Sequence, residues 1–228
     1  MMNGFDPECS ALQKIRLKYN HSNNKTMQIY NHIAHLFNYP KGDYRTVVEK
    51  LHLELQEYGE SLVDDFLPVA AHFTSTPTPE LQEYYIRTFD VNATCYLDIG
   101  YVLFGEESKR GQFLLNMKSE QLKAANDCGT EFPDHLPNVL TLLPRIEDPT
   151  FREELVVTMI LPALKHMLAN FRTEENIYRY LLKILVELLE TDFKDTAFEP
   201  YQINQKEIEC AGAYSCGMDF TKLKTKKY

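Results

Sequence analysis

The 228-residue chain has no tryptophan, and it has few cysteines and few glycines, five and nine respectively. The cysteines are too few and too scattered for a disulfide scaffold, and their odd number suits a reducing compartment. No Cys-x-x-Cys pair is present, which excludes a zinc ribbon and a thioredoxin-type redox site.

Long apolar stretches are also missing. The longest strongly apolar uncharged run, Leu155 to Leu164, has ten residues, about half of a membrane span. The first residues, 1–14, carry Asp6 and Glu8 and lack an apolar core of signal-peptide length. We therefore expect a cytoplasmic protein without membrane insertion.

Motifs that bind phosphate or activate a nucleophile are absent. The sequence contains no Gly-x-Gly, no Gly-Lys-Ser/Thr and no Gly-x-Ser-x-Gly. Acidic residues outnumber basic ones by 33 to 24, and the net charge of −9 disfavours nucleic-acid binding. From these absences we expect that the protein is not an enzyme and binds no cofactor. An acidic surface favours a cationic partner.

Helical periodicity is what the chain does contain. Apolar residues repeat at spacing four through 156–168 and on one face of 177–188, with no alternating β-branched runs. Asp148 and Thr78, each followed by proline, and Thr173, followed by two glutamates, are expected helix starts, whereas Pro162 should kink or split its helix. The pattern predicts an all-α fold, a single bundle of about nine helices. The expected helices are 26–38, 43–57, 60–73, 79–89, 92–104, 107–127, 138–144, 150–171 and 174–190.

The organisation expected from this pattern is an N-terminal extension at 1–25, a helical domain at 26–194 and a flexible C-terminal tail at 195–228. The tail loses the apolar period and ends in four lysines. Both ends are expected to be mobile unless a partner orders them. Cys210 and Cys216 lie in this tail at a spacing that is poor for zinc.

Imidazole side chains offer an alternative interpretation. His32 and His35 lie one helical turn apart, and Glu49 and His52 form a single Glu-x-x-His motif. A helical metal-dependent enzyme would use these four residues, although a four-helix metal site needs more ligands. Solvated helix faces account for them more simply.

Four segments, taken in order, carry a resemblance to a known family. Residues 131–137 read Glu-Phe-Pro-Asp-His-Leu-Pro, and residues 85–90 read Tyr-Ile-Arg-Thr-Phe-Asp, followed by Cys-Tyr-Leu at 95–97. Residues 101–111 and the early Leu-Phe-Asn-Tyr-Pro at 36–40 complete the set. This order resembles the nitrate reductase delta-subunit family, the NarJ-type chaperones related to TorD and DmsD. Phe132 replaces the family's usual leucine, and the tail after residue 195 has no counterpart.

The resemblance implies a dedicated assembly chaperone for a molybdenum oxidoreductase. Such a chaperone binds the N-terminal segment of the apo catalytic subunit and withholds it from export or membrane docking until the molybdenum cofactor is inserted. Proteins of molybdenum cofactor biosynthesis are further implied partners. A permanent structural subunit of a redox complex is the remaining alternative, since a chaperone should leave the mature enzyme.

The expected peptide site joins the helix 92–104 with the loop 131–137 and reaches towards the end of the helix 79–89. Tyr101 and Phe104 lie three apart and would offer apolar anchors, while acidic groups would meet a basic peptide. Each aromatic residue is equally compatible with a core position. Asp134 has a structural alternative, capping the following helix or orienting His135. The candidate site residues are Tyr85, Phe89, Asp90, Tyr101, Phe104, Glu131, Asp134 and His135.

Overall fold

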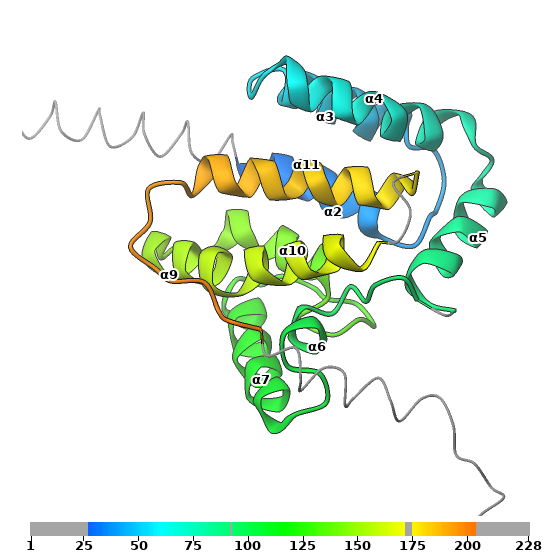
Figure 1. Cartoon of the computed structure of the whole chain (residues 1–228). Helices are drawn as coiled ribbons and strands as arrows, with labels where there is room; N and C mark the ends of the chain where they lie inside the picture. The colour runs from blue at the N-terminus through cyan, green and yellow to red at the C-terminus, as the bar shows by residue number, and fades with distance from the viewer. Residues whose placement is uncertain (1–26, 92, 172–174, 204–228) are drawn as a thin grey trace, which may run out of the picture.

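The computed structural model describes residues 27–91, 93–171 and 175–203, and within these ranges the chain is all-α (Figure 1). The described residues form no strand, and one isolated antiparallel bridge joins Asp98 to His135. The expected fold class is confirmed. Several parts that the sequence singled out lie outside the described residues: the extension 1–25, Thr173, Cys210 and Cys216. The helices are α2 (Ile29–Phe37), α3 (Arg45–Leu55), α4 (Glu60–Ser75), α5 (Thr78–Phe89), α6 (Ile99–Phe104), α7 (Ser108–Lys123), α8 (Leu136–Leu142), α9 (Pro149–Glu154), α10 (Leu161–Asn170) and α11 (Ile177–Asp192).

A short 3-10 turn, Leu143–Arg145, follows α8, and a π-helix, Leu155–Ile160, connects α9 to α10 without a break. If the stretch 149–170 is counted as one helix, the described residues contain nine helices, namely seven from α2 to α8, this one and α11. The number agrees with the expectation. The helix type changes from π to α at Leu161, next to Pro162, so the proline alters the helix there without interrupting it.

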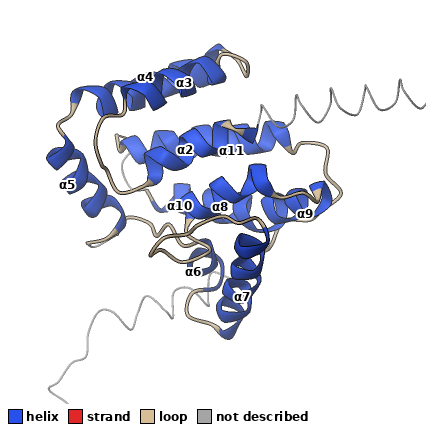
Figure 2. Cartoon of the chain, turned by 180° about the vertical axis from the view of Figure 1, so that it is seen from behind, coloured by secondary structure: helices blue, strands red, loops and turns tan. Residues whose placement is uncertain are grey.

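The helices stack in layers around α2 and α11, which lie side by side in the middle of the molecule (Figures 1 and 2). α3 and α4 cover them on one side, α8 and α10 on the other, and α6 and α7 lie beyond α10. Six of the nine residues of α2 and eight of the sixteen of α11 are buried. These wide apolar faces explain why both helices have neighbours on two sides.

Helix starts follow their local chemistry. Asp148 accepts a hydrogen bond from the backbone N–H of Thr150 at 2.9 Å, as a helix cap should, and Pro149 begins α9. Thr78 is the first residue of α5 and not its cap, and the preceding position is Pro77. Asn176 caps α11 by accepting from the Tyr178 N–H at 2.9 Å.

The expected helix 92–104 is wrong in its first half, because only Ile99–Phe104 is helical. The chain before Ile99 forms bends, and its Leu97 carbonyl accepts a hydrogen bond from the Leu136 N–H at 2.8 Å. A hydrogen bond from a residue 39 positions later satisfies this carbonyl. A local periodic pattern cannot report such a partner.

The packed part of the chain extends beyond the expected boundary at residue 194. Residues 195–203 run along the bundle, where Tyr201 and Ile203 pack against the core. Among the described residues, no helix is both long enough and apolar enough to cross a membrane.

Candidate functional site

The loop 131–137 lies at the centre of the candidate site, because it pairs with the chain just before α6. The Leu136 N–H donates to the Leu97 carbonyl, and the Ile99 N–H donates to the Asp134 carbonyl at 3.1 Å. Gln121 of α7 holds the loop from behind, donating through its side-chain amide to the Pro133 carbonyl at 2.9 Å. Backbone pairing and a buried side chain therefore fix the position of this loop.

Asp134 is completely buried, with 0% of its surface exposed. One carboxylate oxygen, Oδ2, accepts a hydrogen bond from the Gly100 N–H at 2.8 Å, while Oδ1 has no partner among the described residues. Burial raises the pKa of the Asp134 carboxyl, and the bond from Gly100 lowers it in part. Asp134 secures the start of α6, the helix before it in the chain and not the one after it.

This position corrects the expectation that Asp134 offers negative charge to a basic peptide. A carboxyl enclosed by protein atoms is out of reach of a peptide on the surface. Its role is the structural one, holding α6 against the loop.

Gly100 is a residue that the sequence reasoning missed. A Cβ atom at this position would lie 2.8 Å from Asp134 Oδ2 and 2.8 Å from Phe113 Cδ1, closer than real Cβ contacts. Glycine is needed here because Asp134 and Phe113 close on the backbone from two sides. The signal available in the sequence was a glycine inside an expected helix.

His135 is linked through the side chain of Asp98 to that of Arg110. Its Nδ1 lies 3.0 Å from Asp98 Oδ1, and the other oxygen of Asp98 lies 3.6 Å from Nη2 of Arg110. Asp98 thus links the loop to α7 and neutralises part of the arginine charge. His135 is half-buried and is held in place by this contact, so it orients the loop as well as facing the pocket described below.

Aromatic rings surround the arginine at the surface. The Arg110 guanidinium lies 5.0 Å from the ring centre of Tyr101 and 5.8 Å from that of Phe132, distances typical of cation–π contacts. Tyr96 packs on Tyr101 with ring centres 4.6 Å apart. Tyr96 and Phe132 are 48% and 55% exposed, which is unusual for large apolar side chains. We call Tyr96, Tyr101, Arg110 and Phe132 the aromatic–arginine patch.

An open pocket of about 680 Å³ lies on the other side of the loop. The end of α2 with the following loop, α5, the loop 125–131 and the start of α8 form its walls. Three of the candidate residues face it: Tyr85, Glu131 and His135. Burial raises the pKa of the Tyr85 hydroxyl, and the Glu131 carboxylate raises it further, so this hydroxyl stays protonated and can donate a hydrogen bond.

The other candidate residues differ in how far they are exposed to solvent. Asp90 is exposed at the end of α5, and Tyr101 is half-buried beneath Arg110. Phe89 and Phe104 are each 8% exposed and belong to the core. The expectation that Tyr101 and Phe104 share a face open to a peptide is wrong, because Phe104 packs inward.

The rings around the two buried phenylalanines explain this. Phe89 packs against Tyr178 with ring centres 4.6 Å apart, and Phe104 packs between Phe113 at 5.8 Å and Tyr201 at 5.2 Å. Tyr201 comes from the segment that was expected to be a free tail. The Tyr201 ring packs on Phe104, the side chain that we expected to be open to a peptide.

The four residues of the metal alternative do not converge. His32 pairs with Glu54, with Nδ1 and Oε2 2.8 Å apart, and His52 approaches the side chain of Gln56. His35 and Glu49 are exposed on different helices. Within the part of the chain that the structure describes, no group of three or more His, Cys, Asp or Glu side chains could hold a metal ion.

Comparison with known proteins gives no relative: the chain matches none of the family models searched and none of the curated proteins. The described fold and site define a class in physical terms. The described residues form an all-α domain in which an open pocket and an aromatic–arginine patch both adjoin the loop 131–137.

Proposed function

We propose that this protein is a cytoplasmic assembly chaperone that binds the N-terminal segment of the apo catalytic subunit of a nitrate-reductase-like molybdenum oxidoreductase. It holds this segment until the molybdenum cofactor has been inserted. The proposal joins the resemblance to the NarJ-type chaperones with the geometry around the loop 131–137.

The observation that carries the proposal is the convergence of the segments that resemble the family. Tyr39 of the first segment and Tyr85 of the second have ring centres 5.6 Å apart. Leu97 pairs with Leu136, and Arg110 of the third segment lies over the ring of Phe132 in the fourth. Segments that begin at residue 36 and end at residue 137 thus surround one loop, as expected if the resemblance concerns a shared site.

The surface around this loop suits a peptide with apolar and basic residues. Tyr39, 40% exposed, lines the pocket, and Phe132 lies just beyond Glu131 on the loop. Asp127 and Glu131 bring negative charge to the pocket wall, which Lys41 and Arg145 also line. An amphipathic segment can place its apolar side chains on such rings while its cations meet the carboxylates.

Calorimetric titration with the N-terminal peptide of the client's catalytic subunit tests the proposal. Glu131→Lys and Phe132→Ala should each weaken binding by about tenfold, equivalent to about 1.4 kcal/mol. Glu49→Lys and Leu53→Ala are matched controls, because both residues are exposed on α3 and lie outside the pocket and the patch. Since the chain lacks tryptophan, a tryptophan in the peptide gives a second, fluorescent readout.

Two results would contradict the proposal. Binding of neither the peptide nor the whole apo subunit removes the client. Permanent association with the mature, cofactor-loaded enzyme would instead show a structural subunit, because a chaperone dissociates from its finished client.

A further inference from the structure

A groove runs between α7 and the helix that starts at Pro149, away from the site described above. It consists of two adjoining open cavities of about 440 and 570 Å³, which share Glu120, Lys123 and Phe151 in their walls. The apolar side chains that line it come from both helices. In the first cavity they are Phe113, Met117, Phe151, Leu155 and Met159, and Ile146 lines the second.

α7 contributes little to the core, which explains why this groove is open. Of its sixteen residues only Met117 and Gln121 are buried, and α9 has no buried residue. Leu115 and Leu122, 64% and 72% exposed, point into solvent from α7.

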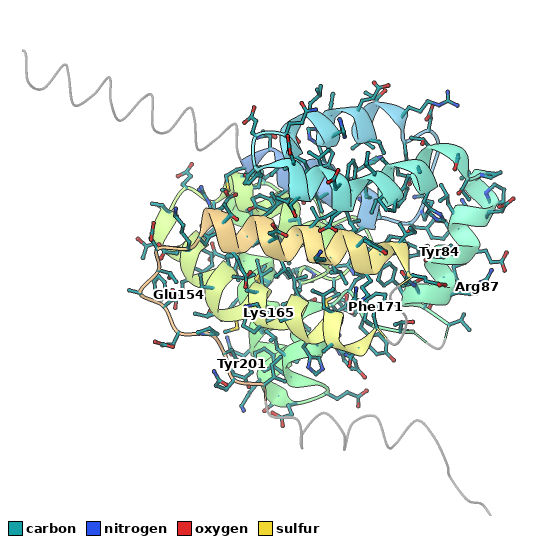
Figure 3. The ribbon with its side chains drawn as sticks, turned by 45° about the horizontal axis from the view of Figure 1, so that its top comes forward. Tyr84, Arg87, Glu154, Lys165, Phe171 and Tyr201 are labelled. Carbon is teal, nitrogen blue, oxygen red and sulfur yellow. The ribbon has the colours of Figure 1, made fainter. Side chains whose placement is uncertain are left out.

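The C-terminal segment leads directly to the groove. The Tyr201 N–H donates to the Thr158 carbonyl at 3.1 Å, and Thr158 lines the groove. Figure 3 labels Tyr201 near the end of the described chain. The ring of Tyr201 packs on Phe104, which in turn packs on Phe113, another groove residue. Two separate contacts thus fix the chain beside the groove two residues before Ile203, the last described residue.

Charge indicates which occupant fits. Four acidic residues line the two cavities against two basic ones: Glu120, Glu147, Asp148 and Glu154 against Lys123 and Arg145. The sequence after Ile203 continues for 25 residues and ends with apolar Phe220 and Leu223 among four lysines. Apolar side chains with positive charge are complementary to an apolar groove with an acidic rim.

We propose that the chain's own C-terminal residues, 204–228, occupy this groove, with Phe220 and Leu223 against its apolar wall and the terminal lysines at its acidic rim. The seventeen residues from Ile203 to Phe220 span up to about 56 Å when extended, which is ample for this reach. Because the two parts belong to one chain, even weak contacts are favoured by the high effective concentration.

A single-tryptophan reporter in the full chain tests the proposal. Phe220→Trp introduces the only tryptophan of the protein, so its emission reports the surroundings of residue 220 alone. We expect emission at shorter wavelength than that of free tryptophan in water and at least twofold protection from acrylamide quenching. Adding Glu120→Lys and Glu154→Lys should shift the emission to longer wavelength and remove the protection.

The matched control reverses two acidic residues elsewhere, Glu49→Lys and Asp64→Lys on α3 and α4, and should leave the emission unchanged. Water-like emission in the reporter chain, or equal shifts from both charge-reversed pairs, would overturn the proposal. Protection that disappears on dilution would also overturn it, because the occupant would then be a second copy of the chain.

Discussion

Gly100 and Asp134 show how much a single position can determine in this protein. The missing side chain of Gly100 lets Asp134 and Phe113 approach the start of α6, and Asp134 is buried as a result. The packing of α6, α7 and the loop 131–137 therefore depends on a hydrogen atom in place of a methyl group.

We predict that Gly100→Ala destabilises the protein by about 1–3 kcal/mol, the range for overpacking in a tight core. The added Cβ would also displace Asp134 from the Gly100 N–H. Urea unfolding measures the change. Gly111→Ala is the control, because nothing lies within 4 Å of its Cβ position inside α7, and alanine should there stabilise by up to about 1 kcal/mol. Equal changes in the free energy of unfolding at both positions would show that the close contact at Gly100 does not affect stability.

Asp134 should also give the stability a pH dependence. Burial raises its pKa in the folded state, so between the unfolded and folded pKa values the folded chain binds more protons than the unfolded chain. Its contribution is complete below the unfolded pKa, near 4, and is lost as pH rises through the folded pKa. Asp134→Asn keeps a side-chain oxygen that accepts from the Gly100 N–H. Because the amide does not ionise, the variant does not lose this stability as pH rises.

The variant Asp134→Asn should therefore be at least as stable as the wild type at neutral pH, and its advantage should shrink as pH falls towards 4. Urea unfolding over a pH series tests this. An advantage that grows in acid would reverse the assigned direction of the pKa shift.

The helix from Pro149 to Asn170 shows the consequence of one proline for an entire element. In an α-helix the Thr158 carbonyl would accept from residue 162, but Pro162 has no N–H. The backbone forms π turns up to Ile160, and the Tyr201 N–H bonds to the Thr158 carbonyl. A carbonyl left without its usual helical donor thus anchors the C-terminal segment.

We predict that Pro162→Ala weakens this anchor, because the restored N–H competes with Tyr201 for the Thr158 carbonyl. Hydrogen exchange of the amides in 198–203 should become about tenfold faster, while far-UV circular dichroism changes little. Pro68→Ala in α4 is the control, since it also restores an N–H inside a helix but far from the segment. Unchanged exchange in 198–203 would show that the contacts of the Tyr201 ring suffice.

At the scale of the whole molecule, Asp192 joins the end of the described bundle to its beginning. The Tyr30 hydroxyl donates to Asp192 at 2.6 Å across 162 residues of sequence, and the Tyr58 hydroxyl donates to the same carboxylate at 3.1 Å. Burial raises the pKa of Asp192, and both tyrosine bonds act to lower it. These bonds join α2 and the turn that follows α3 to the end of α11.

Removal of one donor tests the importance of this junction. Tyr30→Phe should cost about 1.5–3 kcal/mol, the range for a bond to a charged group, and the unfolding transition should remain single. Tyr58→Phe should cost less, because Tyr58 is only half-buried and its bonds are longer. Tyrosine fluorescence and circular dichroism in urea should report the same midpoint, and separate midpoints would contradict a single cooperative domain.

The sequence by itself determined the helices, because their signals are local. Apolar spacing predicted the expected helices 150–171 and 174–190, and Asp148 with Pro149 predicted a start, since a cap and the first turn involve residues only a few positions apart. The helices therefore need no information about distant partners. The resemblance, and not a local signal, singled out the loop 131–137 and Tyr85.

Tertiary structure alone decided which candidate residues face outward. The spacing of Tyr101 and Phe104 could not reveal that Tyr201, almost a hundred residues later, covers Phe104. Nor could the motif around Asp134 show that its carboxyl bonds to Gly100 instead of facing solvent. Exposure depends on contacts between segments far apart in the chain, and such contacts leave no periodic trace in a single sequence.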